Sequence, residues 1–239
     1  FDEIRIIGGW EKFANRLFAM GKKLFITGSN AKLLSSEIAS SLTGRNRIIE
    51  LFPFSFREYL NYKNFPVKEN YNTEERAGLS SHLESYIKLG GFPEVIKSRD
   101  TGDLVQLYRD ILIKDLLVRL KIRDTADFRE LALYLLSNTA RKMSYNNLRK
   151  ILDFSSTTKV KEYVDSMMDA WLFLPLLKYN PSLKKQLIND RKIYGIDTGL
   201  IGANAFSFSR EKGRLMESVV FLELKRRGLD IYYHRDKTE

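Results

Sequence analysis

The sequence predicts an α/β beginning followed by a mainly helical chain. Three observations indicate this fold class. Over the first 60 residues, short apolar runs alternate with helical apolar periodicity, as in parallel strands joined by helices. From about residue 73 the periodicity is mainly helical. Between residues 144 and 197, a helix, a turn, a second helix and a basic hairpin follow one another, which is the layout of a winged helix.

The α/β part is read element by element as helix, strand, helix, strand. Trp10 and Ala14 belong to an apolar stripe that predicts a helix ending at Gly21. The wholly apolar run 24–26 before Thr27 predicts a strand buried on both faces. A second helix is expected around 34–42, and a second strand at 48–51.

Helices dominate the next part of the chain. Ser55 and Glu58 have the spacing of a capping box, so a helix is expected to begin there. The polar stretch 61–73 is interpreted as a loop. Apolar stripes then predict three helices, near 79–87, 104–120 and 128–136, with a break at 90–93 after the first.

The last part contains the predicted winged helix and one more helix. Its helices are expected at 147–152 and from about 157, and its strands at 171–174 and 191–196. A final helix follows Gly202 and ends at Gly228, before a strand at 231–234.

Composition excludes several kinds of chemistry. The 239 residues include no cysteine, which excludes disulfides, thiolate metal sites and a cysteine nucleophile. Only two histidines are present, which disfavours a multi-histidine metal site or a catalytic triad. No apolar run is long enough to span a bilayer, and no signal peptide precedes the first strand. A cytoplasmic protein with no membrane partner is expected.

The positive charge is concentrated in one part of the chain. The net charge is +10, and residues 141–192 hold eleven basic and five acidic residues, a net charge of +6. A concentrated positive field favours a polyanion such as nucleic acid. Lys159, Lys161, Lys184 and Lys185 are suited to phosphate contacts, and hence to mostly non-specific DNA binding. Solvated lysines, or a protein-binding winged helix, are the alternatives.

Two pairs of polar residues could form a catalytic site. Asp2 and Glu3 are interpreted as the end of a buried strand, and Ser29 and Asn30 follow the apolar run 24–26. Acids suit this position because Mg²⁺ and an attacking water both need anionic partners. The plainer interpretations are a surface Asp-Glu pair and a helix N-cap. Arg45 is either a phosphate-binding arginine or a surface residue at a helix end.

A family resemblance covers essentially the whole chain. It is carried by Phe-Ile-Thr-Gly-Ser-Asn, Leu-Thr-Gly-Arg and Glu-Leu-Phe-Pro-Phe-Ser-Phe-Arg-Glu-Tyr in that order, and then by Gly-Gly-Phe-Pro-Glu, Asp-Thr-Gly-Leu and Gly-Arg-Leu-Met-Glu. With these motifs the chain resembles archaeal and bacterial AAA-type P-loop ATPases that carry a C-terminal domain of unknown function. The family usually has Gln where this chain has Arg5.

The resemblance implies ATP and Mg²⁺ as cofactors and assigns roles to the candidate residues. Asp2 and Glu3 would be the Walker B acids, with Asp2 holding Mg²⁺ through water. Asn30 or Ser29 would contact the γ-phosphate, and Arg45 would face the nucleotide. The family's G-x-x-x-x-G-K-[ST] loop is absent from this sequence. Phosphate binding, and therefore ATPase activity, is expected to be lost in this fragment alone.

The resemblance also implies a restriction-endonuclease-like C-terminal part. Glu217 matches a helix glutamate that binds a divalent metal in such nucleases, whereas a solvated helix acid is the alternative.

Together, these interpretations divide the chain into four parts. They are the second half of a P-loop ATPase domain (1–60), a helical segment (61–140), a winged-helix-like domain (141–200) and the start of a nuclease-like domain (201–239). The expected function is ATP hydrolysis by the intact parent, coupled to remodelling of DNA or protein. The alternatives are a non-enzymatic nucleic-acid-binding regulator and a metal-dependent nuclease. Protein partners and oligomeric state are left open.

Overall fold

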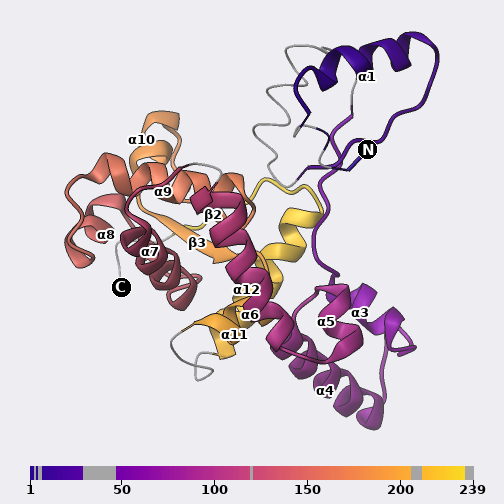
Figure 1. The fold of residues 1–239 in the computed structure, drawn as a ribbon. Helices are drawn as coiled ribbons and strands as arrows, with labels where there is room; N and C mark the ends of the chain where they lie inside the picture. The colour runs from indigo at the N-terminus through magenta and orange to yellow at the C-terminus, as the bar shows by residue number, and fades with distance from the viewer. Residues whose placement is uncertain (3, 5–6, 29–46, 119–120, 206–211, 235–239) are drawn as a thin grey trace. The chain divides into compact units, whose positions relative to one another are not determined.

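The chain folds into two compact units. The computed structural model describes residues 1–2, 4, 7–28, 47–118, 121–205 and 212–234. One unit contains Phe1–Leu51 and Asp169–Trp171, and the other contains Phe52–Met168 and Leu172–Glu239. Figure 1 shows α1 in the first unit and the remaining labelled elements in the second. Within the described ranges, no helix is both long enough and apolar enough to cross a lipid bilayer.

The first unit is built around helix α1 (Trp10–Ala19). Trp10 and Ala14 are buried together with Ile4, and Leu24 and Ile26 pack against them. The predicted helix and its end before Gly21, which has a φ of 73°, are therefore observed. Phe13 and Phe18, which have the spacing of the same apolar stripe, are 39% and 43% exposed.

Two backbone segments of the first unit lie side by side. The Phe1 nitrogen donates to the Phe25 carbonyl oxygen at 2.7 Å, and the Thr27 amide donates to the Phe1 carbonyl oxygen at 3.0 Å. This alternation about Ile26 is the hydrogen-bonding pattern of parallel strands. The expected strand buried on both faces at 24–26 does not form, because the pairing is short and Phe25 is exposed.

The strand expected at 48–51 does not form. Ile48, Ile49 and Leu51 are more than 60% exposed, and the segment has no secondary structure. A strand needs a neighbour to satisfy its backbone groups, and no described segment pairs with this one. The helix expected around 34–42 lies outside the described residues.

The second unit begins with helices. They are α3 (Phe56–Tyr62), α4 (Thr73–Leu89), α5 (Pro93–Ser98), α6 (Gly102–Asp110), the π-helix η2 (Ile111–Val118) and α7 (Thr125–Ser137). The capping box predicted at the start of α3 is present: the Ser55 amide donates to Glu58 Oε2 at 2.7 Å, and the Glu58 amide donates to Ser55 Oγ at 3.2 Å. The π-helix replaces the later turns of the predicted 104–120 α-helix. Apolar spacing alone does not reveal this change in hydrogen bonding.

A small antiparallel sheet with three helices follows. In chain order, these elements are β1 (Lys142–Met143), α8 (Tyr145–Ile151), α9 (Thr157–Asp169), β2 (Phe173–Leu177), α10 (Leu183–Ile188) and β3 (Arg191–Gly195). The strand order is β1–β3–β2, and Leu174 of β2 lies opposite Tyr194 of β3. Apolar residues of α7 and α9, such as Phe128 and Val164, are fully buried. The sequence did not predict α10, which lies within the expected basic loop.

The C-terminal part packs within the same unit. Helix α11 (Thr198–Asn204) contacts α4, α6, α7, α12 and β3, and helix α12 (Lys212–Arg226) contacts α4 and β3. The expected strand at 231–234 is reduced to one parallel bridge, between Tyr233 and Lys178 beside the end of β2. Apart from residues 169–171, the described residues from 52 to 234 belong to one compact unit. The expected boundaries at 140 and 200 stay predictions.

Candidate functional site

The side chains of Asp2 and Thr27 meet in the first unit. The parallel pairing of Phe1 with the segment 25–27 brings the ends of the two segments together. There, the Thr27 hydroxyl donates a hydrogen bond to Asp2 Oδ1. Both side chains present oxygen atoms at the ends of the paired segments. Together they can bind a cation or an ordered water.

Thr27 is a site residue that the sequence analysis missed. It ends the apolar run 24–26, and this position is the signal that could have identified it. Glu3, Ser29, Asn30 and Arg45 lie outside the described residues, so of the five candidates in this part only Asp2 is placed.

The side-chain oxygens of Asp2 and Thr27 meet part of the requirement of a Mg²⁺ site. Mg²⁺ in nucleotide sites is commonly held by one or two carboxylates together with water and phosphate oxygens. Asp2 supplies one exposed carboxylate, and the Thr27 hydroxyl fixes its orientation. Over the described ranges, no group of three or more His, Asp or Glu side chains gathers into a metal site.

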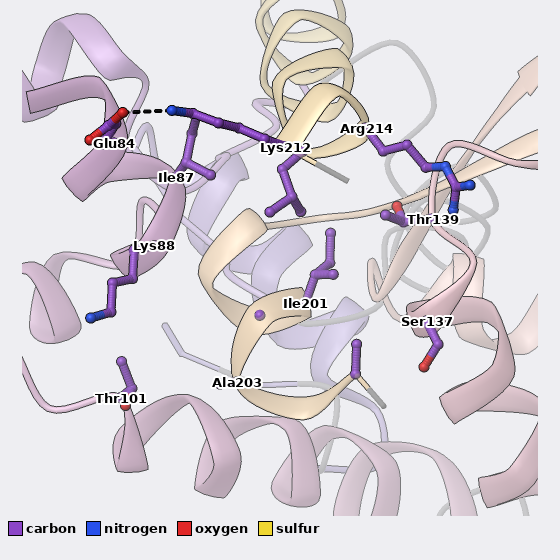
Figure 2. Close-up of a pocket in the computed structure, with 13 residues that line it drawn as sticks. Glu84, Ile87, Lys88, Thr101, Ser137, Thr139, Ile201, Ala203, Lys212 and Arg214 are labelled. Atoms are coloured by element: carbon purple, nitrogen blue, oxygen red, sulfur yellow. Dashed lines mark hydrogen bonds and ion pairs between the residues drawn. The ribbon is translucent and has the colours of Figure 1, made fainter. Parts of the chain in front are cut away.

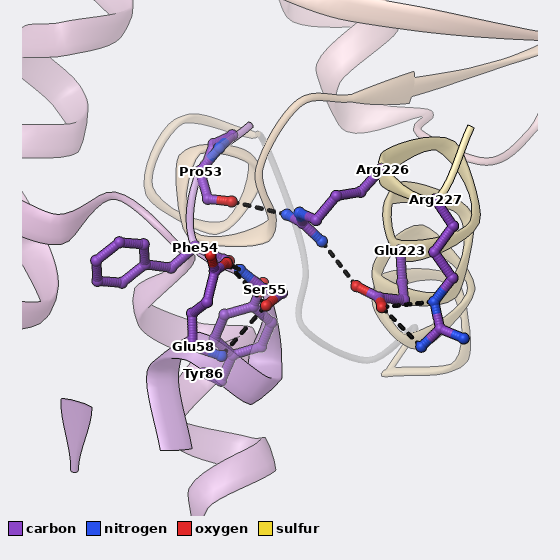
Figure 3. A network of polar contacts seen from close by, with 8 residues as sticks. All are labelled: Pro53, Phe54, Ser55, Glu58, Tyr86, Glu223, Arg226 and Arg227. Carbon is purple, nitrogen blue, oxygen red and sulfur yellow. Dashed lines mark hydrogen bonds and ion pairs between the residues drawn. The ribbon is translucent and has the colours of Figure 1, made fainter. Parts of the chain in front are cut away.

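A second cluster surrounds the point where the chain enters the second unit. We call it the junction, and define it as Pro53, Phe54, Tyr86, Gly91, Asp197 and Arg226. The Phe54 amide donates to the Gly91 carbonyl oxygen at 2.7 Å, and the Tyr86 hydroxyl donates to the Phe54 carbonyl oxygen at 2.6 Å. Arg226 Nη2 donates to the Pro53 carbonyl oxygen at 2.7 Å, as Figure 3 shows. Two helices, α4 and α12, thereby hold the segment 53–54.

Asp197 connects the junction to α11. Its Oδ2 accepts from the Gly91 amide at 2.6 Å, and its Oδ1 accepts from the Leu200 amide at 2.8 Å. The side chain is buried, which raises the pKa of Asp197 to about 6, although hydrogen bonds from backbone amides oppose this shift. The carboxylate is thus a helix cap that also fixes the 90–91 turn.

Glycines make this close packing feasible. Gly90 has a φ of 77°, and a Cβ there would overlap the Asp197 carboxylate. A Cβ at Gly91 would overlap the Phe54 carbonyl oxygen, and one at Gly199 would overlap the Leu89 carbonyl oxygen. The Gly-Gly-Phe-Pro and Asp-Thr-Gly-Leu motifs therefore have a common structural role.

Two of the four lysines proposed for phosphate contacts are held by carboxylates. Lys159 Nζ lies 2.7 Å from Asp124 Oδ2 and 3.0 Å from Asp127 Oδ2, and these hydrogen bonds raise the pKa of Lys159. Lys161 Nζ lies 2.8 Å from Asp165 Oδ2. A phosphate would have to displace carboxylates to reach either lysine.

The other two lysines lie on α10. Lys184 and Lys185 are exposed, and neither forms an ion pair with a residue in the described ranges. No residue of α10 is buried. Of the predicted basic surface, this helix offers the lysines that a phosphate can approach without competition.

Glu217 joins α12 to β3. Its Oε1 accepts from Lys192 Nζ at 2.7 Å and from the Tyr194 hydroxyl at 2.6 Å. Partial burial acts to raise the pKa of Glu217, but these two hydrogen bonds hold it below its ordinary value. The Tyr194 ring also stacks on Phe221 with 3.9 Å between centroids. The immediate partners of Glu217 are thus a cation and a phenol rather than further carboxylates.

Comparison with known proteins identifies the larger part of the second unit. Residues 80–210 match the family model described as Domain of unknown function (DUF8612). The chain belongs to this family. Both Gly91 and Asp197 lie within the DUF8612 match, whereas Phe54 and Arg226 lie outside it.

The N-terminal part matches another family model. Residues 1–60 match an AAA domain, so this part is related to AAA-type ATPases. This match includes all the candidate nucleotide-site residues, as well as Thr27. The resemblance to AAA-type ATPases that carry a C-terminal domain of unknown function is confirmed at this level. Neither match concerns a winged helix or a nuclease.

Two curated relatives resemble nearly the whole chain. An uncharacterized protein of Methanocaldococcus jannaschii is 40% identical over 236 residues, covering 95% of this chain and 53% of the relative. An uncharacterized protein of Haemophilus influenzae is 30% identical over 243 residues, covering 96% of this chain and 58% of the relative. The chain therefore spans little more than half the length of these relatives. No solved structure matches it.

Proposed function

We propose that residues 1–60 supply the acidic side of an ATP-hydrolysing site of the AAA type, and that the DUF8612 domain is the part that ATP hydrolysis moves. The observation that carries this proposal is the hydrogen bond between Thr27 and Asp2, on adjacent parallel segments. In P-loop ATPases a strand-end carboxylate holds Mg²⁺, and a neighbouring acid orients the attacking water. The AAA-domain match over the same residues supports the assignment.

Each candidate residue has a role in this proposal. Asp2 would hold Mg²⁺ through water, and Thr27 would orient the Asp2 carboxylate. Glu3 would accept the proton of the attacking water, and Ser29 or Asn30 would donate to the γ-phosphate. Arg45 would offset negative charge on the phosphates. When bound, Mg²⁺ neutralises phosphate charge during transfer.

The junction supports coupling between the two parts. The chain passes from Leu51 directly into the segment 52–54, which α4 and α12 hold by hydrogen bonds to Phe54 and Pro53. A displacement of this segment would therefore strain the hydrogen bond between Phe54 and Gly91, and through Gly91 the one to Asp197. We propose that this is how a nucleotide-dependent movement reaches the DUF8612 domain.

The test uses the full-length protein that the gene encodes. Glu3→Gln should lower the rate of ATP hydrolysis about 100-fold or more, because it removes the base, while binding of a fluorescent ATP analogue is retained. Glu50→Gln, an exposed acid of the same unit, is the matched control and should leave the rate unchanged. Unchanged turnover in the Glu3→Gln variant would exclude this assignment.

Nucleic-acid binding through α10 is the second proposed function. The exposure of Lys184 and Lys185, with no acidic partner in the described part of the chain, favours it. The order α7, β1, α8, α9, β2, β3 with strand order β1–β3–β2 supports a winged-helix interpretation, in which α10 lies in the wing. Helix α9 carries Lys159 and Lys161 but also Glu162, Asp165 and Asp169, so it is a poor phosphate-binding face.

Fluorescence anisotropy with a labelled DNA duplex tests this second function. The Lys184→Glu/Lys185→Glu variant should weaken binding tenfold or more at low salt and reduce the salt dependence. Lys22→Glu/Lys23→Glu, another adjacent and exposed pair, controls for net charge. Equal weakening in both variants would show that only total charge matters.

A further inference from the structure

A cavity of about 660 Å³ opens beside α11 in the second unit. It is lined from α4, α11, α12, the start of α6 and the end of α7. We call it the α11 pocket, and Figure 2 shows its lining residues. Its volume lies within the range of small-molecule sites, about 300–1,000 Å³. The functions proposed above make no use of it.

Part of the pocket lining is apolar. Ile87 of α4 and Ile201 of α11 are both buried, and Leu215 of α12 also lines the cavity. Figure 2 shows Ile87 on α4 and Ile201 on α11, two helices that contact each other. Such a surface favours an apolar body, because burying it removes apolar area from water.

The charged residues of the pocket are mostly basic. The lining cations are Lys88, Lys212 and Arg214, and the acid in the lining is Glu84. Glu84 Oε1 accepts from Lys212 Nζ at 2.5 Å, and Figure 2 shows this ion pair between α4 and α12. Lys88, one helical turn beyond Glu84, has no ion pair with a described residue. The lining therefore retains a net charge of +2.

Hydroxyl groups add hydrogen-bonding capacity. Thr101, Ser137 and Thr139 also line the cavity. The Thr139 side chain is buried, and its Oγ1 accepts from the Gly195 amide at 3.2 Å. A hydroxyl that accepts from a backbone amide can still donate its own proton to a ligand oxygen. Arg214 and Thr139 line the same cavity and are both labelled in Figure 2, so the lining offers a cation and a hydroxyl donor.

We propose that the α11 pocket binds a small organic anion, with a phosphate or carboxylate group on an apolar body. The cations and the Thr139 hydroxyl would bind the anionic group, since charge-assisted hydrogen bonds to oxyanions are strong. Ile87, Ile201 and Leu215 would hold the apolar body. A nucleic acid is too large for the cavity, and an organic cation would be repelled by its net charge.

Such a ligand would also influence the fold around it. Helix α11 contacts α4, α6, α7, α12 and β3, and its N-cap Asp197 belongs to the junction. A ligand that bridges α4, α7 and α12 over α11 stabilises this arrangement by binding only the folded state. The pocket thus allows a small anion to stiffen the DUF8612 domain, independently of any ATPase activity.

Isothermal titration calorimetry on the chain tests the proposal, with phenyl phosphate and phenylacetate as probes of the two anionic groups. At least one should bind at millimolar concentration, and at least tenfold more tightly than inorganic phosphate, which lacks the apolar body. Phenol, which has the ring without the charge, should not bind measurably. If neither anion binds at 10 mM, or if phenol binds equally well, the proposal is wrong.

Variants locate the binding to this pocket. Gly202 lines the cavity, and a Cβ there would meet nothing within 4 Å, so the side chain of Gly202→Leu is expected to extend into the cavity. This change in α11 also raises helix propensity, so the thermal midpoint should be kept or raised while binding is lost. Lys88→Gln should weaken binding several-fold, whereas Lys97→Gln on α5, outside the lining, should not. Wild-type affinity in a folded Gly202→Leu variant would overturn the assignment.

Discussion

The Asp197 carboxylate accepts a hydrogen bond from the Gly91 amide at 2.6 Å, although the two residues are 106 positions apart in the chain. The same carboxylate caps α11 through the Leu200 amide. One buried anion thus fixes the end of α4, the turn before α5 and the start of α11. No described cation compensates the charge of Asp197. The backbone amides of Gly91 and Leu200 therefore stabilise its charged form.

Replacing Asp197 by asparagine should destabilise the second unit. Asparagine keeps one acceptor oxygen but turns an amide NH₂ group towards either Gly91 or Leu200, whose backbone groups are also donors. A buried donor left without an acceptor costs about 1–3 kcal/mol. Urea unfolding, followed by circular dichroism, measures the loss. A variant as stable as the wild type would show that the two hydrogen bonds contribute little.

The pH dependence of stability should report the same carboxylate. Burial raises the pKa of Asp197 to about 6 from an ordinary 3.8, so the folded chain binds this proton more tightly than the unfolded chain. The contribution of Asp197 to stability is therefore fully present below pH 4 and falls as the pH rises towards 6. The loss is at most about 3 kcal/mol, since one pKa unit corresponds to about 1.4 kcal/mol.

Other carboxylates titrate in the same range, so the comparison must be made between variants. The unfolding free energy of the wild type minus that of Asp197→Asn should decrease between pH 4 and pH 7. A difference that stays constant over this range would mean that Asp197 titrates near its ordinary pKa in the folded state.

Gly91 is expected to tolerate no side chain. A Cβ at this position would overlap the Phe54 carbonyl oxygen, which is part of the backbone and also accepts from Tyr86. Gly91→Ala should therefore cost about 2 kcal/mol or more, because the segment 53–54 must move and its hydrogen bonds weaken. Gly213→Ala is the matched control: its Cβ would meet nothing within 4 Å, and stability should be unchanged or up to about 1 kcal/mol higher. Thermal unfolding of both variants makes the comparison.

Local patterns in the sequence predict the elements whose signals are themselves local. The Ser55–Glu58 capping box, helix α1 and strand β3 all follow from short-range spacing. Relations across long separations are not predicted. The hydrogen bonds of Asp197 with Gly91 and of Glu217 with Tyr194 cannot be predicted from neighbouring residues. In both pairs, tertiary packing brings together elements that are distant in the sequence. The strand expected at 48–51 was wrong for the same reason: apolar character indicates burial, but pairing needs a neighbour.

The candidate site shows the same limit. The acidic character of Asp2 predicts a site residue, but the sequence does not reveal its hydrogen bond to Thr27, which lies 25 residues further along the chain. The prediction for Lys159 and Lys161 rests on their charge alone. Lys159 is paired with Asp124 and Asp127, more than 30 residues earlier in the chain, and sequence composition does not reveal such pairs.

Glu217 is expected to stabilise the fold rather than to bind a metal ion. Its Oε1 accepts from both Lys192 and Tyr194, so Glu217→Gln should weaken two hydrogen bonds between α12 and β3 and lower stability by about 1–3 kcal/mol. Tyr194→Phe should lower it by less, and the double variant by less than the sum, because the two residues share one contact. The unfolding free energy should be the same with 5 mM Mn²⁺ as with EDTA. If Mn²⁺ stabilises the wild type but not Glu217→Gln, then Glu217 contributes to a metal site after all.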